Sequence, residues 1–413
     1  MKHLVVIGGG FAGVRAAQAA AATARAARRR LRVTLVAESE RTTLRPRLYL
    51  AEPESWEAPL RPALEPLGIR LLLSRAGAID AAQREVVMEG DISRLRYDAA
   101  IVATGSRLRW PAVPGLREAA LDVDTYAGAA RLLRHLSGLG SAPSDSIFAV
   151  VGAGFTGLEV ATELRGTLAR LHGPERAKSA RILLIDRNAA APDLGAQPRP
   201  AIEEALAAAR IETRFGRNVA EAEPGALVLS DGERIAAGTI VYSGGLEARP
   251  LPIRPDLPRD ALGRLVTDAF LRVDRVEGLF AAGDAAHAAV DEAGTLALMS
   301  CQHAIPMGDR AGRNAAAALL GLKLIPYRQT AYVTCLDLGE SGALFSVGRD
   351  RQVVFTGEPA KEIKRAINAG IAPPSGSAEA MLRALDGIAA SADDLPQRLA
   401  RLGASGEAGR LAA

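Results

Sequence analysis

The sequence predicts an α/β fold, because one strand–helix–strand pattern occurs twice along the chain. LVVIGGGFAG (residues 4–13) leads into an alanine-rich helix and then into LRVTLVAE (residues 31–38). SIFAVVGAGFTG (residues 146–157) leads into a second helix and then into ARILLID (residues 180–186). The apolar runs do not alternate with polar residues, which is typical of parallel strands covered on both faces. Each pattern is therefore the opening of a βαβ unit.

Composition limits the size and class of the protein. The chain has 413 residues, and at about 150 residues per domain this predicts two or three domains. Its net charge of +4 comes from arginines scattered along the chain, so no nucleic-acid surface is expected. Cys301 and Cys335 have neither a metal-ligand spacing nor the framework of a secreted disulfide protein. The first strand directly follows Met1, and we therefore expect no leader and a cytoplasmic protein.

The first glycine set has the spacing of a dinucleotide fingerprint. Gly8 permits the tight turn after the strand, Gly10 lets a pyrophosphate approach the backbone, and Gly13 lets helix and strand pack closely. The N–H groups at the start of the following helix are free to bind phosphates. Glu38 ends the second strand, where it can accept hydrogen bonds from ribose hydroxyls. These residues predict a first dinucleotide site.

The second glycine set repeats this logic with Gly152, Gly154 and Gly157. Asp186 closes its second strand, where a carboxylate accepts a hydrogen bond from the ribose 2′-hydroxyl and repels a 2′-phosphate. The second site should therefore prefer NADH to NADPH, although the neighbouring Arg187 could soften that preference.

Two dinucleotide sites in one chain indicate a flavin and a nicotinamide cofactor. Two further strand–turn stretches, YDAAIVATGS (residues 97–106) and GLFAAGDAAH (residues 278–287), complete a pattern that resembles the two-dinucleotide-binding flavoprotein superfamily. This superfamily includes the pyridine nucleotide-disulfide oxidoreductases. The resemblance implies that Thr104 and Gly105 lie near the flavin nucleotide, and that Gly283 and Asp284 bind the ribityl or pyrophosphate part of FAD.

Within that superfamily the sequence resembles the type II NADH dehydrogenases. LRPRLYL (residues 44–50) is similar to the segment that passes under the flavin ring, which implies that Arg45 and Pro46 belong to the cofactor site. VATGSRLRWPAVPGL and VYSGGLEARPL also occur in that family's order. The CxxxxC and CxxC motifs of disulfide reductases are absent from the sequence. The resemblance therefore implies hydride transfer from NADH to FAD, followed by reduction of a quinone.

The resemblance also suggests how the domains are arranged. It implies an FAD-binding domain made of residues 1–115 and 251–325, with an NADH-binding domain of residues 116–250 inserted in it. Residues 326–413 would form a small α+β cap of short strands and helices. In the cap, Lys361 and Lys364 fit the polar face of a short helix, whereas Met381 and Leu385 belong to an apolar stripe. We expect this stripe to pack on the protein body or on a partner subunit, with membrane contact peripheral at most and a homodimer as an open alternative.

Glu159 follows the second fingerprint and matches a glutamate that lies near the nicotinamide in related proteins. The resemblance gives it a role in managing charge or protons at the flavin. The alternative is a solvated acid, which is favourable in the first turn of a helix.

The stretch MSCQHAIPMGD (residues 299–309) aligns with the helix under the flavin, where an AQxAxQ pattern faces the quinone. Gln302 matches the first glutamine, whereas Pro306 replaces the second and Cys301 replaces an alanine. Cys301 could be a small buried residue, a reactive thiol whose pKa is lowered by the helix N-terminus, or a partner of Cys335. For His303 we expect a packed or solvent-facing side chain rather than an acid–base role.

These features predict an FAD-dependent NADH dehydrogenase with a quinone-like acceptor. Two alternatives stay open: a flavin-dependent sulfide or thiol oxidoreductase that uses Cys301, with or without Cys335, and a slow redox-sensing flavoprotein.

Overall fold

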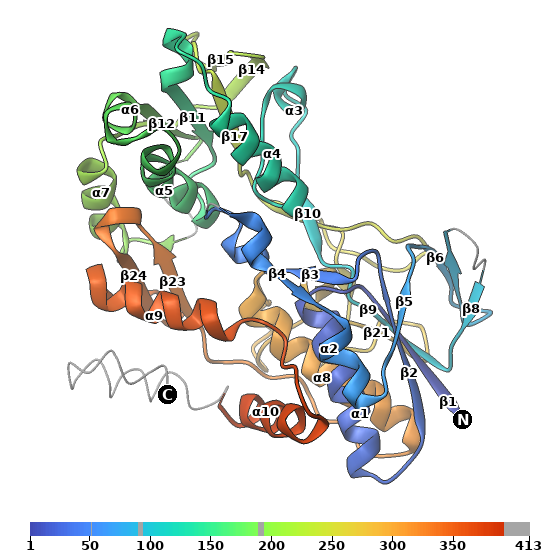
Figure 1. Cartoon of the computed structure of the whole chain (residues 1–413). Coiled ribbons are helices and arrows are strands. Elements are labelled where there is room, and N and C mark those ends of the chain that lie inside the picture. The colour runs from blue at the N-terminus through green and yellow to red at the C-terminus, as the bar shows by residue number, and fades with distance from the viewer. Residues whose placement is uncertain (51, 90–93, 189–193, 392–413) are drawn as a thin grey trace.

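The structure is a computed structural model, and it describes residues 1–50, 52–89, 94–188 and 194–391. Two parallel sheets lie one above the other, and a small antiparallel sheet packs beside their junction (Figure 1). The predicted α/β fold is confirmed. The domain bounds stay a prediction, although the first sheet takes strands from both sides of residues 116–250.

The first sheet has the strand order β21-β9-β1-β2-β5, and all its pairs are parallel. Its strands are β1 (Lys2–Ile7), β2 (Leu31–Ala37), β5 (Arg70–Leu73), β9 (Ala99–Val102) and β21 (Leu279–Ala281). Helices α1 (Phe11–Ala26) and α8 (Cys301–Leu320) lie side by side against this sheet (Figure 1). They approach closely because α8 presents glycines to α1: a Cβ at Gly312 would lie 2.1 Å from the carbonyl oxygen of Ala16.

The second sheet has the order β13-β12-β11-β17 and is also parallel. Its strands are β11 (Ile147–Val151), β12 (Arg181–Asp186), β13 (Ile211–Phe215) and β17 (Thr239–Tyr242). Its helices are α4 (Tyr126–Ser137), α5 (Phe155–His172), α6 (Pro174–Ser179) and α7 (Arg199–Ala208). Both predicted strand–helix–strand units are therefore present, β1-α1-β2 and β11-α5-β12.

Smaller sheets, most of whose strand pairs are antiparallel, extend both units and join them. β6 (Ala76–Asp80), β7 (Glu85–Met88), β8 (Arg94–Arg96) and β19 (Ile253–Arg254) form one sheet, and β14 (Val219–Glu223), β15 (Ala226–Leu229) and β16 (Arg234–Ile235) form another. The chain crosses between the two units at β10 (Ser106–Leu108), which pairs with β18 (Leu246–Ala248) on the way back. Smaller pairs are β3 (Arg41–Thr43) with β4 (Glu57–Pro59), and β20 (Leu265–Val266) with β22 (Ala286–His287). Short helices α2 (Arg61–Leu64) and α3 (Leu116–Ala119) complete this part.

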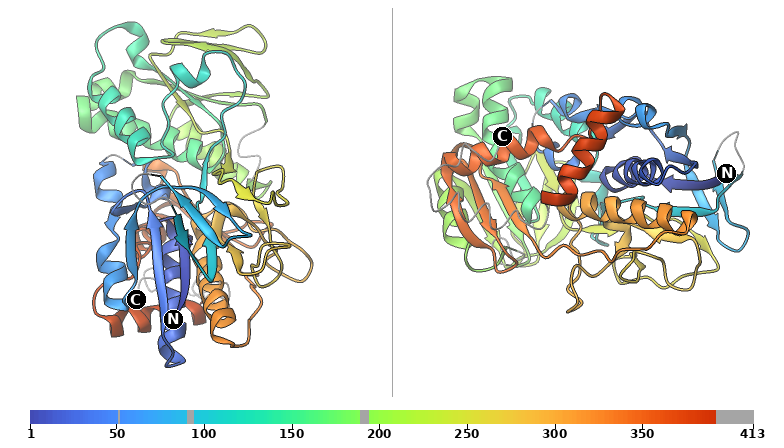
Figure 2. Two further views of the ribbon diagram at one scale, coloured as in Figure 1. Left: turned by 90° about the vertical axis from the view of Figure 1, so that its right-hand side faces the viewer. Right: turned by 90° about the horizontal axis from the view of Figure 1, so that it is seen from below.

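The C-terminal part forms a sheet of β23 (Val333–Asp337), β24 (Ala343–Val347) and β25 (Gln352–Thr356), followed by α9 (Gly357–Gly370) and α10 (Ala378–Ser391). This sheet and α9 face α5, and α10 runs beneath α1 (Figures 1 and 2). Met381 and Leu385 are fully buried, and Arg15 of α1 donates to the Leu385 carbonyl at 2.9 Å. The apolar stripe therefore packs on the protein body, which is one of the two packings that we expected from the sequence, the other being a partner subunit.

No helix in the described part of the chain is both long and apolar enough to cross a bilayer.

Candidate functional site

The first fingerprint forms a tight loop between β1 and α1. Gly8 has φ +121°, and a Cβ there would lie 2.1 Å from the carbonyl oxygen of Ala103. A Cβ at Gly13 would lie 1.8 Å from the carbonyl oxygen of Gly8, so the helix can begin directly against the loop only with glycine there. Gly10, by contrast, has no atom within 4 Å of an added Cβ. The loop therefore leaves open space in front of the N-terminus of α1.

The second fingerprint repeats this geometry between β11 and α5. A Cβ at Gly157 would lie 1.7 Å from the Gly152 carbonyl oxygen, whereas Gly154 again faces open space. At the end of β12, Asp186 accepts from the backbone N–H of Ala153 at 2.7 Å through one oxygen and from Asn188 at 2.8 Å through the other. The carboxylate is thus held against the second loop.

Glu38, at the end of β2, is exposed. Its carboxylate lies 3.4 Å from the guanidinium of Arg249 and 3.8 Å from that of Arg75. The strand registers place Ala37 level with Asp186 of the second unit, so Glu38 lies one residue further along than Asp186.

A polar network joins the segment that follows β3 to the turn after β21. Arg45 donates to Ser106 Oγ at 3.1 Å and forms an ion pair with Asp124. Ser106 Oγ donates in turn to Asp284 at 2.6 Å. Burial raises the pKa of Asp284, while Ser106 and the Arg45 cation oppose that rise. The structure therefore brings Arg45 and Asp284 together through Ser106, and it adds Asp124, which no motif indicated, as a partner of Arg45.

The remaining predicted cofactor residues lie around this network. Pro46 begins a short 3-10 helix together with Arg45. Gly105 adopts φ +71°, and its carbonyl accepts from the N–H of Arg249 at 2.9 Å. The N–H of Gly283 lies 3.1 Å from the sulfur of Met307 on α8. Thr104 lies between the end of β9 and the start of β10, and its hydroxyl is 3.5 Å from the Arg249 carbonyl oxygen.

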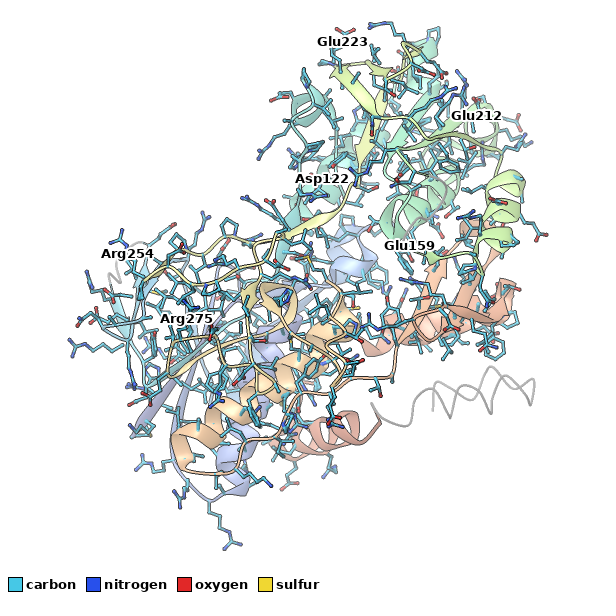
Figure 3. The ribbon with its side chains drawn as sticks, turned by 180° about the vertical axis from the view of Figure 1, so that it is seen from behind. Asp122, Glu159, Glu212, Glu223, Arg254 and Arg275 are labelled. Atoms are coloured by element: carbon cyan, nitrogen blue, oxygen red, sulfur yellow. The ribbon has the colours of Figure 1, made fainter. Side chains whose placement is uncertain are left out.

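Glu159 is buried and paired. It projects from the second turn of α5 toward the C-terminal sheet (Figure 3). Lys364 of α9 donates to Glu159 Oε1 at 2.5 Å and to the Cys335 carbonyl at 2.8 Å. Burial raises the pKa of Glu159, and the Lys364 ammonium opposes this rise. The alternative of a solvated acid is therefore wrong, because only 6% of the Glu159 surface is exposed.

The pair belongs to a larger buried network. Lys361 lies 2.5 Å from Asp337 and 3.1 Å from Glu163, and the Tyr49 hydroxyl donates to Asp337 at 3.0 Å. Burial raises the pKa of Tyr49. The prediction of a solvated polar face is therefore wrong for Lys361 and Lys364, whose ammonium groups meet the acids of α5 and β23. It holds for Arg365 on the same helix, which is exposed.

Helix α8 begins at Cys301, as the sequence predicted, and Ser300 caps it through the N–H of His303. The amide of Gln302, oriented to satisfy both of its groups, donates to the Val333 carbonyl at 2.8 Å and accepts from the Val333 N–H at 3.0 Å. Gln302, which was expected to face an acceptor, therefore binds the edge of the C-terminal sheet in this structure.

Pro306 lies inside the first turns of α8, where it has no N–H for the carbonyl of Gln302. Gln329 fills this gap, since its Nε2 donates to that carbonyl at 2.9 Å. Its Oε1 accepts from the Tyr327 hydroxyl at 2.6 Å and lies 3.2 Å from Nδ1 of His303. His303 is buried, and burial lowers its pKa to about 4. The histidine is therefore neutral and packed, as expected.

The two cysteines are free thiols. Burial raises the pKa of the Cys301 thiol, and this effect exceeds the opposing influence of the Arg47 and Lys364 cations. Burial also raises the pKa of Cys335 to about 12. Of the three possibilities that the sequence left open for Cys301, the small buried residue is therefore favoured over a thiol of lowered pKa, because desolvation outweighs the helix N-terminus.

Arg47 is a second cation close to Cys301, besides Lys364. Its side chain is almost fully buried, and its Nε has no hydrogen-bond partner among the described residues. Within the part of the chain that the structure describes, its side chain makes one hydrogen bond, which it donates to the carbonyl of the preceding Pro46 at 3.1 Å. Burial lowers the pKa of Arg47. Arg47 lies in the LRPRLYL stretch and Lys364 on the predicted polar face of a helix, but the sequence singled out neither of them as a residue of the site.

The residues present fit two dinucleotides. Each fingerprint leaves open space at its middle glycine, at the N-terminus of a helix of 16 residues (α1) or 18 residues (α5). Backbone N–H groups at such a terminus bind phosphate. The acids at the ends of β2 and β12 stand where ribose hydroxyls would lie.

Comparison with protein families and curated proteins agrees with this geometry. Residues 2–308 match the family model described as pyridine nucleotide-disulphide oxidoreductase. The chain is 42% identical over 399 residues to an NADH dehydrogenase-like protein of Mycobacterium tuberculosis, covering 93% of this chain and 98% of that protein. It is 27% identical over 360 residues to a demethylphylloquinone reductase of Synechocystis, and this match covers 83% of this chain and 86% of that protein.

Solved structures share the fold. NDH2 from Plasmodium falciparum in complex with NADH superposes with a TM-score of 0.76 at 12% identity, covering 93% of this chain and 97% of that one. A sulfide:quinone oxidoreductase from Aquifex aeolicus superposes with a TM-score of 0.71 at 18% identity, and this match covers 89% of this chain and 90% of that one. At these identities the likeness concerns the fold alone.

Proposed function

Because this chain is a type II NADH dehydrogenase-like member of the pyridine nucleotide-disulphide oxidoreductase family, we propose that it binds FAD and NADH and reduces a quinone-like acceptor. One observation carries this proposal: the chain has two fingerprint loops with open space at Gly10 and Gly154. In this proposal FAD occupies the α1 loop and NADH the α5 loop. The bound flavin would supply the two-electron chemistry between NADH and the acceptor.

Asp186 favours NADH as the reductant. Its carboxylate is fixed by two backbone N–H groups beside the second loop. A negative charge held there repels the 2′-phosphate of NADPH. The protein should therefore have a higher kcat/KM with NADH than with NADPH. Asp186→Asn keeps the size of the side chain and removes its charge, so it should lower the ratio of kcat/KM for NADH to kcat/KM for NADPH.

Glu159 and Lys364 provide a buried acid and a buried ammonium group beside the start of α5. Both side chains are more than nine-tenths buried, so neither can exchange protons freely with bulk water. In the proposed function this pair balances charge, and holds a proton at Glu159 Oε1 or Lys364 Nζ, next to the bound nicotinamide.

The start of α8 is the acceptor side in this proposal. Arg47 keeps an unpartnered Nε near Cys301, and this N–H can donate to a carbonyl oxygen. The alternative of a thiol or sulfide oxidoreductase is less favoured, because burial raises the pKa of both cysteines and a nucleophilic thiol must deprotonate.

The proposed function is tested by reducing the purified flavoprotein with NADH without oxygen and following flavin absorbance. A water-soluble quinone should then restore the oxidised spectrum, and do so faster than a disulfide or a sulfide-derived species. Cys301→Ser should leave NADH:quinone turnover within about twofold. A large loss in this variant would support the thiol alternative, and very slow bleaching by NADH would support a redox sensor.

A further inference from the structure

Arg351 is a buried cation without a partner anion among the residues that the structure describes. It lies in the turn between β24 and β25, and 6% of its surface is exposed. Nη1 is buried without a hydrogen-bond partner, and no carboxylate of a described residue lies within ion-pair distance of the guanidinium. A guanidinium has five N–H donors and stays charged in proteins. A buried group of this kind calls for an acceptor, preferably an anion.

Two aromatic rings bring this guanidinium to the second fingerprint. Its central carbon lies 5.4 Å from the ring centre of Tyr332 and 5.5 Å from that of Phe155. The rings attract the cation by their π faces but offer no conventional acceptor to its N–H groups. Phe155 is the first residue of α5. The cation therefore lies beside the N-terminus of the helix that follows the loop.

That terminus is itself positive and uncapped. The N-cap residue of α5 is Gly154, which has no side chain to accept from the first N–H groups, and an added Cβ at Gly154 would meet nothing within 4 Å. The free N–H groups and the helix dipole favour an anion in this space. Two independent features, the helix terminus and the unpartnered guanidinium, thus point to the same negatively charged ligand.

We propose that Arg351 is a binding residue for the pyrophosphate of the nicotinamide dinucleotide, supplied to the second fingerprint by the C-terminal sheet. The inference rests on the proposed function, since it takes the α5 loop as the NADH site. Arginine suits the task because its planar donors match phosphate oxygens. The C-terminal region thereby becomes part of the dinucleotide site.

The backbone and the surrounding stack hold Arg351 in place. Arg351 has φ +56°, a left-handed conformation that non-glycine residues adopt only occasionally. The Tyr332 ring also stacks on His303 of α8, with the two rings nearly parallel and their centres 5.5 Å apart. A stack of His303, Tyr332, Arg351 and Phe155 therefore links the starts of α8 and α5.

The chain contains a matched control. Arg349 lies 5.7 Å from the same Tyr332 ring, but it is exposed and donates to the Leu296 carbonyl at 3.0 Å. It should therefore not be needed for the nucleotide. We compare Arg351→Met, Arg351→Lys and Arg349→Met in the flavin-loaded protein, and measure the dissociation constants of ADP-ribose, which contains the pyrophosphate, and of adenosine, which has no phosphate.

Arg351→Met should weaken ADP-ribose binding about 10- to 100-fold, the loss expected for one charge-assisted hydrogen bond or ion contact. Adenosine should bind within about twofold of the wild type. Arg351→Lys keeps the positive charge but not the planar guanidinium, so it should weaken ADP-ribose binding less than Arg351→Met does. Arg349→Met should leave the affinity for ADP-ribose about unchanged. Because Arg351→Lys retains the cation, it keeps the comparison informative if Arg351→Met folds poorly.

Unchanged ADP-ribose affinity in Arg351→Met, together with a lower melting temperature, would make Arg351 a purely structural contact and overturn the inference. An equal loss for adenosine and ADP-ribose would also overturn it, because it would not depend on the pyrophosphate. The proposed function fails separately, if the wild type binds neither ADP-ribose nor NAD⁺.

Discussion

The buried His303 makes stability depend on pH in a way that the structure lets us calculate. Burial lowers the pKa of His303 from 6.5 to about 4. In the unfolded chain the ring should titrate near its ordinary value. Between these two values the unfolded state binds a proton that the folded state refuses, so stability is present above pH 6.5 and is lost as the pH falls toward 4.

The magnitude follows from the shift. One pKa unit corresponds to about 1.4 kcal/mol, so a shift of roughly 2.5 units amounts to about 3 kcal/mol in total. Of this, about 2 kcal/mol should be lost between pH 7 and pH 5, because the unfolded state is by then almost fully protonated at this site. Other groups titrate in the same range, so the contribution of His303 must be measured as a difference between proteins.

His303→Asn isolates that contribution. The asparagine amide can replace Nδ1–H as the donor to Gln329 and does not titrate. The variant should be less stable at pH 7, yet lose about 2 kcal/mol less than the wild type between pH 7 and pH 5. Urea unfolding of the holoenzyme at both pH values measures this, and NMR of labelled histidine measures the pKa directly. Equal losses in the two proteins, or a His303 pKa near 6.5 in the folded state, would refute the reasoning.

Two further predictions concern stability. Lys364→Met leaves Glu159 buried without its partner and should destabilise the protein by about 3–5 kcal/mol in urea unfolding; adding Glu159→Gln should recover much of that loss, and no recovery would contradict the role of the pair. Gln329→Leu leaves the Gln302 carbonyl without a donor and should cost about 1–3 kcal/mol. Pro306→Ala restores a backbone N–H that can donate to the Gln302 carbonyl. Gln329→Leu should therefore lower the free energy of unfolding by about 1 kcal/mol less in a Pro306→Ala protein than in the wild type. Purely additive effects of the two substitutions would contradict this account of Gln329.

The fingerprint geometry could be predicted because it is local. Gly8 and Gly13 are five residues apart in the chain, and a side chain at Gly13 would clash with the Gly8 carbonyl oxygen within the loop itself. The same holds for the start of α8 at Cys301, which the sequence placed correctly. Acids at the ends of β2 and β12 follow from strand length alone. In such cases a short stretch contains both the constraint and the residues that meet it.

The charged interior could not be predicted in this way. Lys364 and Glu159 are 205 positions apart, and the pair exists only because α9 packs against α5. The periodicity of α9 shows that it has a polar face, but not whether this face meets water or acids. The pKa of Cys301 is a similar case, since the helix N-terminus is visible in the sequence and the burial that outweighs it is not.

By itself, the sequence determined the fold class, the two glycine loops and the acids beside them, because these depend on steric limits within a few residues. Only the tertiary structure decided what surrounds the site: that Gln302 binds Val333, that Gln329 compensates for Pro306, and that Arg351 reaches the start of α5. The physical reason is that desolvation and charge pairing depend on distances between segments remote in sequence, and packing alone sets those distances.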